Sequence, residues 1–224
     1  VPDGQIEPSS LNLDTNVFPS STGLVSYKPS FATGTGSLGV SSGTASLSLS
    51  GNQGILVTDT ASAYAIPFPQ FFVACKISSN GAGSSADAVG CGIAKDGSNF
   101  LIAHWNRTGT AHTNVTIDVA GSVSNLATFN ISVPTAPWYF GLSLVGNHAS
   151  TWYSTNGTTW NFLATADVTS QKDFTVTGAL ANWYFCMEAD LASGSSTWAF
   201  QSLKGGAFGG VGIRDTRFVT YPDG

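Results

Sequence analysis

The chain has 224 residues, of which 42% are hydrophobic and only 9% are charged, and its formal net charge is −5 at pH 7. Its 8 lysines and arginines are too few to line a groove for phosphate backbones, so we expect no nucleic-acid partner. No stretch approaches the roughly 20 uninterrupted apolar residues that a membrane span needs. This composition predicts one globular domain that is solvated mainly by Ser, Thr, Asn and Gly.

The first segment of the chain is interrupted by prolines at positions 2, 8, 19 and 29. Because proline cannot donate a backbone hydrogen bond, we expect residues 1–30 to form an irregular N-terminal arm. The alternative is a leader strand with loops that pack at a sheet edge. Residues 31–224 are expected to form a single β-sandwich domain.

Short strand-like segments follow one another along residues 31–224, separated by clusters of Gly, Asn, Asp and Ser. Ala45, Leu47 and Leu49 alternate with serines, and no segment shows a helical period. This pattern predicts an all-β fold, an antiparallel two-sheet jelly-roll sandwich. The expected strands are 45–50, 55–57, 71–77, 89–94, 100–105, 113–119, 138–145, 150–155, 158–163, 174–176, 183–188 and 196–201, and a glycine-rich loop after residue 205 leads into a last strand.

The three cysteines are Cys75, Cys91 and Cys186. If the strands 71–77 and 89–94 form a hairpin, Cys75 lies opposite Cys91, and a cross-strand disulfide is geometrically possible. Two small buried hydrophobic thiols are the alternative. No Cys-x-x-Cys pair exists, so a structural zinc site is not expected.

The strongest turn signal is Asn156-Gly157, which lies between two alternating segments. A two-residue type I′ turn at this dipeptide would place Trp152 opposite Asn161 and Tyr153 opposite Trp160. The sequence therefore predicts a tight hairpin whose two strands present different faces.

One face of this hairpin carries an aromatic ring beside amide and hydroxyl groups, which is typical of sugar binding. We expect the Trp152 ring to point away from the core and to be exposed, with Asp118 joining from the strand 113–119. The alternative is that Trp152 packs under a loop or against a neighbouring subunit. The candidate ligand-binding residues are Trp152, Tyr139, Asn161, Ser143 and Asp118.

Other chemically active residues are few. Glu188 and Asp190 are the only closely spaced acidic pair on a strand, and strand alternation puts both side chains on one face. A catalytic pair is conceivable, but two solvated carboxylates at a strand end are the preferred interpretation. His104 precedes Trp105 in a strand and is a candidate to line a site. The remaining aspartates are scattered, so we expect no metal and no cofactor.

The runs Cys91 to Ala103, Tyr153 to Trp160 and Gly210 to Val219 resemble the concanavalin A-like (laminin G-like) jelly rolls of lectins, carbohydrate-binding modules and phage surface proteins. The resemblance covers about residues 31–221. It implies two curved antiparallel sheets with ligands on the concave face or at the loop rim. Glycosidases of this fold place paired glutamates on one strand, whereas Glu7 and Glu188 are the only glutamates here, so we do not expect an enzyme.

These observations favour a non-catalytic, lectin-like carbohydrate-recognition module that binds a glycan on its mixed sheet face. The alternative is a virion or cell-surface assembly protein that uses the sandwich to contact other copies or neighbouring subunits. Low charge and abundant hydroxyl side chains suit an extracellular or virion-surface location.

Overall fold

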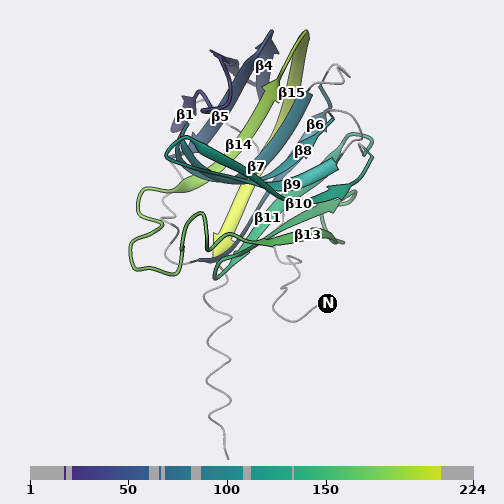
Figure 1. Cartoon of the computed structure of the whole chain (residues 1–224). Coiled ribbons are helices and arrows are strands. Elements are labelled where there is room, and N and C mark those ends of the chain that lie inside the picture. Colours follow the sequence, from purple (N-terminus) through teal and green to yellow (C-terminus); the bar gives the residue numbers. More distant parts are fainter. Residues whose placement is uncertain are drawn as a thin grey trace, which may run out of the picture.

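The computed structural model describes residues 18, 22–60, 66, 69–81, 87–107, 112–132 and 134–207. In this part of the chain every regular element is a β-strand, and the strands form two stacked sheets (Figure 1). The predicted all-β sandwich with two sheets in a jelly-roll arrangement is confirmed. The described residues contain no helix that is long and apolar enough to cross a membrane.

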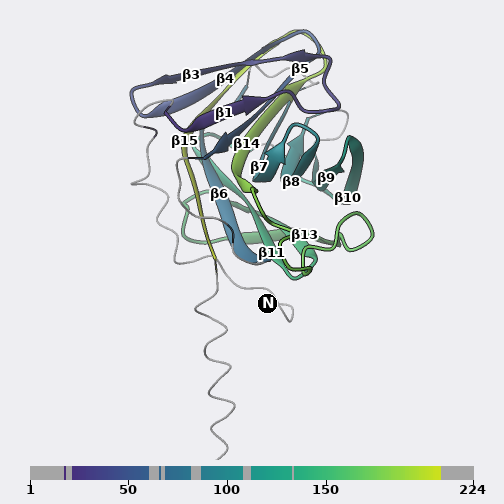
Figure 2. The ribbon, with the colours of Figure 1, turned by 90° about the vertical axis from the view of Figure 1, so that its left-hand side faces the viewer.

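The first sheet has eight strands in the order β1-β5-β14-β7-β8-β9-β10, with β2 beside β5. Their bounds are β1 Leu24–Tyr27, β2 Gly34–Thr35, β5 Gln53–Asp59, β7 Asp87–Asp96, β8 Asn99–Asn106, β9 His112–Val119, β10 Ser122–Asn130 and β14 Tyr184–Leu191. Every pair is antiparallel except β2 with β5. In Figure 2, β7 to β10 follow one another across this layer.

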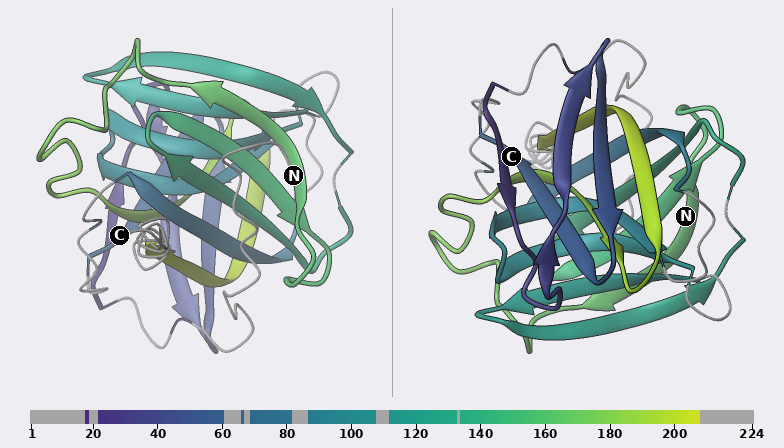
Figure 3. Two further views of the ribbon diagram at one scale, coloured as in Figure 1. Left: turned by 90° about the horizontal axis from the view of Figure 1, so that it is seen from below. Right: turned by 90° about the horizontal axis from the view of Figure 1, so that it is seen from above.

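The second sheet has seven strands in the order β13-β12-β11-β6-β15-β4-β3, and all its pairs are antiparallel. Their bounds are β3 Ser37–Ser41, β4 Thr44–Ser50, β6 Gln70–Ser79, β11 Trp138–Val145, β12 His148–Ser154, β13 Asn161–Asp167 and β15 Ser195–Ala207. Figure 3 views the two layers from below and from above. The expected strand after the last glycine loop falls outside the described residues.

The core lies between the sheets, and three tryptophans join them. Trp105 of β8 makes edge-to-face contacts with Trp138 of β11 and Trp198 of β15, at centroid distances of 6.3 and 5.9 Å. All three rings are buried and belong to one large apolar cluster. We call the face of each sheet that points away from this core its outer face.

The N-terminal part of the described chain is more regular than an arm. β1 lies inside the segment expected to be irregular and pairs with β5 at the edge of the eight-stranded sheet, as the leader-strand alternative proposed. After β1 the chain turns over the outer face, where the Ser30 amide donates to the Gly97 carbonyl at 2.7 Å.

The predicted hairpin of Cys75 and Cys91 is wrong. Cys75 lies on β6 of one sheet and Cys91 on β7 of the other, and both thiols point into the core. Cys91 donates a hydrogen bond to the Phe140 carbonyl at 3.1 Å, and all three cysteines are free. Burial raises the pKa of Cys75 and Cys186 well above the ordinary thiol value. These thiols therefore behave as small buried hydrophobic groups, the second alternative.

The strand expected at residues 174–176 is also absent, because this segment forms a series of turns between β13 and β14. The Asp173 carboxylate accepts hydrogen bonds from the Thr175 amide at 2.9 Å and from its hydroxyl at 2.5 Å. Such local bonds compete with strand pairing. Phe174 is buried instead as an anchor of the loop, with its ring 5.4 Å from that of Trp183.

The turn at Asn156 and Gly157 is wider than the predicted type I′ hairpin. Of the two turn residues only Gly157 has a positive φ, +74°, and the side-chain oxygen Oδ1 of Asn156 accepts hydrogen bonds from the Thr158 and Thr159 amides, as in an Asx turn. β13 begins later than expected, so Trp152 pairs with Phe162 and Tyr153 with Asn161. The predicted register is therefore off by one residue at Trp152 and Tyr153, and by two residues from Thr151 onward, where the pairing is irregular.

We expect Gly157→Ala to destabilise the fold more than Gly121→Ala. Both glycines have positive φ, +74° and +86°, so each alanine costs about 1 kcal/mol of backbone strain. A Cβ at Gly157 would also lie 2.9 Å from the buried Tyr139 ring, whereas a Cβ at Gly121 meets nothing within 4 Å. Overpacking adds about 1–3 kcal/mol at Gly157 alone. Urea unfolding followed by tryptophan fluorescence measures both changes, and equal losses would contradict the packing of Tyr139.

Candidate functional site

Trp152 lies on the predicted face of its sheet, but its ring is not exposed as predicted. Trp152 lies on the outer face of the seven-stranded sheet, in a small cluster with Phe72, Ala74, Tyr139 and Trp160. The ring is only 2% exposed, because the Phe162 ring lies 5.4 Å from it. The expected exposed stacking ring is therefore wrong, because a ring from the neighbouring strand β13, rather than a loop or another subunit, covers it.

The other predicted residues on this sheet take part in the same packing or lie apart from it. Ser143 Oγ accepts the indole hydrogen bond of Trp152 at 2.9 Å, and Tyr139 is buried beside Trp160, with ring centroids 6.4 Å apart. Asn161 is exposed at the start of β13, opposite Tyr153 rather than Trp152. The predicted platform is a closed cluster that stabilises the sheet.

Asp118 lies on the opposite side of the sandwich. It occupies the outer face of the eight-stranded sheet, where its Oδ2 accepts a hydrogen bond from Ser30 Oγ at 2.5 Å. The neighbouring Phe31 places its ring edge-on to Phe100 at 5.9 Å. Asp118 therefore does not join Trp152, and instead holds residues 28–32 against the sheet.

The same outer face carries a row of polar side chains that the sequence analysis did not assemble. Glu188 of β14, Gly90 of β7, His104 of β8 and Asn114 of β9 are consecutive cross-strand neighbours. All four residues are buried, yet the side chains of Glu188, His104 and Asn114 point away from the core between the sheets. Strand order brings them together, and adjacent positions in the chain give no sign of it.

Glycine on β7 makes this row possible. Because Gly90 has no side chain, His104 Nε2 comes within 3.4 Å of Glu188 Oε2 and within 2.9 Å of Asp190 Oδ2. A Cβ at Gly90 would lie 2.7 Å from the Ala103 carbonyl oxygen and 3.4 Å from Glu188 Oε2. Any larger residue would separate the carboxylates from the imidazole or displace β8.

The surroundings of Glu188 strongly shift its pKa. Its side chain is fully buried, and neither carboxyl oxygen has a well-formed hydrogen bond. Burial raises the pKa of Glu188 well above its ordinary value, and the neighbouring Asp190 carboxylate raises it further. Glu188 and Asp190 share a face as predicted, but the expectation of two solvated carboxylates is wrong for Glu188. A buried carboxyl with a shifted pKa next to a histidine is a functional-site candidate.

An ion pair between the half-buried Arg107 and the buried Asp87 has a structural role at one end of the core. Arg107 Nε lies 3.1 Å from Asp87 Oδ1, and its guanidinium lies 5.3 and 5.7 Å from the rings of Trp105 and Trp198. Asp87 Oδ2 also accepts from Ser196 Oγ at 2.9 Å. These contacts close the core beside the tryptophan trio.

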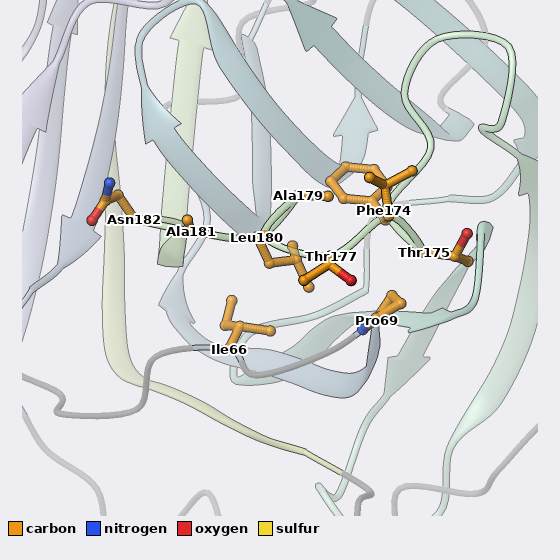
Figure 4. A pocket seen from close by; sticks show the side chains of 11 residues that line it. Ile66, Pro69, Phe174, Thr175, Thr177, Ala179, Leu180, Ala181 and Asn182 are labelled. Carbon is orange, nitrogen blue, oxygen red and sulfur yellow. The ribbon is translucent and has the colours of Figure 1, made fainter.

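A pocket of about 360 Å³ lies at the rim of the sandwich, beside the loop that follows β13. Figure 4 shows Ile66, Pro69 and Leu180 among the side chains around it. Its described lining residues are apolar or neutral, with hydroxyl groups on Thr175 and Thr177. The pocket therefore offers shape and a few hydrogen bonds, but none of the charged or imidazole groups of the polar row.

The fold and this site define a class: a two-sheet β-sandwich with a recessed polar row on one outer face. No family model matches the chain, and no curated protein matches it either. Among solved structures, it is similar to the carbohydrate-binding module CBM66 from Bacillus subtilis, at 11% identity and a TM-score of 0.55, over 83% of this chain and 96% of that chain.

Two further structures share the fold. A functionally unknown protein from Saccharomyces cerevisiae matches at 12% identity and a TM-score of 0.54, over 84% of this chain and 98% of that chain. The GH43B protein of a Bacteroides ovatus xyloglucan locus matches at 12% identity and a TM-score of 0.51, over 74% of this chain but 33% of that chain. At such identities the likeness concerns the fold alone.

We expect Asp118→Asn to gain stability relative to the wild type as the pH rises from about 3.5 to 7. Burial raises the pKa of Asp118 above its ordinary value, which the Ser30 hydrogen bond only partly offsets. The ionised carboxylate therefore costs folding free energy above the unfolded pKa of about 3.9 and costs nothing below it. Asparagine removes this cost and keeps an acceptor for Ser30.

Thermal unfolding of both proteins at the two pH values measures the effect. Asp167→Asn is the matched control, because hydrogen bonds from Thr169 lower the pKa of the exposed Asp167. That variant should change in the opposite direction, losing stability relative to the wild type at neutral pH. A pH-independent difference for Asp118→Asn would show that its carboxylate is not penalised by burial.

Proposed function

We propose that the protein is a non-catalytic, lectin-like carbohydrate-recognition module of the concanavalin A-like kind. A neutral or weakly charged glycan binds on the outer face of the eight-stranded sheet, rather than at Trp152. The similarity to a carbohydrate-binding module over 96% of that module's length supports the class. The location of the binding surface has to be argued from this chain's own residues, because a likeness at 11% identity does not transfer residue roles.

The observation that carries the proposal is the polar row together with the partly exposed Asp190 carboxylate beside it. Sugar hydroxyls both donate and accept hydrogen bonds, and carboxylates, amides and imidazoles are suitable partners for them. Asp190 keeps a side-chain exposure of 20%, so it is the carboxylate within reach of a ligand. Farther along β9, Thr116 Oγ1 donates to the exposed Asn125 at 2.8 Å, which extends the polar surface towards β10.

An aromatic ring lies on the same face. Phe31 is 38% exposed and rests on Phe100, which stands four positions before His104 on β8. Four residues of a strand span about 13 Å, so the ring and the polar row are separated by the length of a short oligosaccharide. We propose that Phe31 stacks on one sugar unit while Asp190 and Asn125 bind the hydroxyls of others.

The proposed setting is extracellular or on a virion surface. A surface of hydroxyl and amide groups with only 9% charged residues suits contact with neutral polysaccharides. Assembly with other copies or neighbouring structural subunits is the alternative function, and it serves as an outcome of the test below.

We expect specific binding on an array of plant, fungal and bacterial glycans, followed by calorimetry with the best ligand. Phe31→Ala and Asn125→Ala should each weaken the affinity at least tenfold, since one stacked ring or hydrogen bond contributes about 1.4 kcal/mol.

Matched controls come from the two other candidate surfaces. Phe162→Ala removes an equally exposed ring from the seven-stranded sheet, and Thr177→Trp fills the rim pocket. Both variants should bind like the wild type. Loss of binding in a control alone would place the ligand elsewhere, and no binding together with a defined oligomer in light scattering would favour assembly.

We further expect no cleavage of the bound polysaccharide. Retaining glycosidases need two carboxyl groups about 5 Å apart that both reach the glycosidic bond. Glu188 and Asp190 are close enough, but Glu188 is fully buried. A reducing-end assay checks this, and activity that disappears in Glu188→Gln while binding persists would establish an enzyme instead.

A further inference from the structure

We propose that His104, Glu188 and Asp190 form a binding site for a divalent transition-metal ion of the Zn²⁺ or Mn²⁺ type. This inference revises the expectation of no metal, and it does not depend on glycan binding. It rests on the convergence of three donor atoms and on the unmatched burial of one of them.

The donor atoms already converge. His104 Nε2, one carboxylate oxygen of Glu188 and one of Asp190 all lie within 4.8 Å of one another. The separations from His104 are 3.4 Å to Glu188 and 2.9 Å to Asp190. Zn²⁺ bonds of about 2.0–2.2 Å place neighbouring tetrahedral donors roughly 3.4 Å apart. Small side-chain rotations are therefore enough to bring all three atoms onto one ion.

The backbone holds these donors in place. Glu188 and Asp190 alternate on β14, so both point to the outer face, and they belong to a central strand of the sheet. His104 reaches them across β7 because position 90 is glycine. A site built on paired strands rather than on loops needs little ordering when the ion binds.

A second, independent observation points to a ligand. Glu188 is fully buried, and neither of its carboxyl oxygens makes a well-formed hydrogen bond within the described part of the chain. Its nearest polar neighbours are His104, 3.4 Å away, and the like-charged Asp190. Buried polar groups are otherwise almost always satisfied, and a buried carboxylate needs a compensating charge. An ion of charge +2 balances the two carboxylates and gives one buried oxygen of Glu188 a partner.

The donor set selects the kind of ion. One imidazole with two carboxylates suits first-row transition ions, whereas Ca²⁺ and Mg²⁺ prefer oxygen ligands alone. Three protein ligands leave at least one coordination position for water or another oxygen donor. We therefore expect Zn²⁺ and Mn²⁺ to bind, and Ca²⁺ and Mg²⁺ to bind much more weakly.

The test uses tag-free full-length protein, stripped with a chelator and titrated with ZnCl₂ or MnCl₂ by calorimetry. We expect one ion per chain, confirmed by elemental analysis after dialysis. Glu188→Gln and His104→Gln should each weaken Zn²⁺ binding at least tenfold. Asp190→Asn, at the partly exposed member of the cluster, should do the same.

The chain offers a matched control on the other sheet. His148 of β12 and Asp167 of β13 are an exposed cross-strand histidine and aspartate pair. His148→Gln and Asp167→Asn should leave Zn²⁺ affinity unchanged. Circular dichroism verifies the fold of each variant, and the visible absorption of bound Co²⁺ reports the ligand set directly.

Two results would overturn the inference. One is wild-type protein that binds neither Zn²⁺ nor Mn²⁺ at millimolar concentration. The other is unchanged Zn²⁺ affinity and Co²⁺ absorption in folded His104→Gln and Glu188→Gln proteins. Because the readouts are metal affinity and spectrum, their failure leaves the glycan-binding result intact, and the reverse also holds.

Discussion

Burial on both faces of the central strands is the constraint on which the rest of the structure depends. In the eight-stranded sheet, β14, β7 and β8 have the core on one side and a second layer of packed side chains on the other. A polar side chain on such a strand cannot be hydrated, so it must be matched within the protein or by a ligand. Glu188, on the central strand β14, is a carboxyl group for which the described protein groups supply no well-formed hydrogen bond. The cation proposal follows from this group and its neighbours, whereas the glycan proposal follows from the partly exposed Asp190 and the surface beside it.

Glycines decide how the two outer faces differ. On the eight-stranded sheet, Gly90 leaves space through which a histidine and two carboxylates meet. On the seven-stranded sheet, Gly141 and Gly157 leave space that aromatic rings fill, with Phe72 and Tyr139 packed directly against them. The first face therefore keeps a recessed polar row, whereas the second is closed by a tryptophan-rich cluster. The missing side chains therefore make room for polar groups on one outer face and for packed aromatic rings on the other.

Much of the fold follows from the sequence, but the candidate site does not. Alternation assigns the faces of β11 and β12 correctly, because side chains must alternate along any strand. It does not report exposure, since Trp152 could be open or covered with the same alternation, and Phe162 and Trp160 cover it. The turn prediction failed because Asn156 uses its side chain as an acceptor, which lengthens the loop and shifts the register.

The sequence by itself determined the all-β class, the two-sheet sandwich, the common face of Glu188 and Asp190, and the shortage of basic residues. These are local properties, fixed by period, composition and adjacent positions. Only the tertiary structure decided that Cys75 and Cys91 belong to different sheets and that His104 meets Glu188 across Gly90. The reason is that β14 lies between β5 and β7 in the eight-stranded sheet, whereas β6, which lies between β5 and β7 in the sequence, belongs to the seven-stranded sheet. Such long-range pairings depend on how all strands share one core, which no short stretch of sequence specifies.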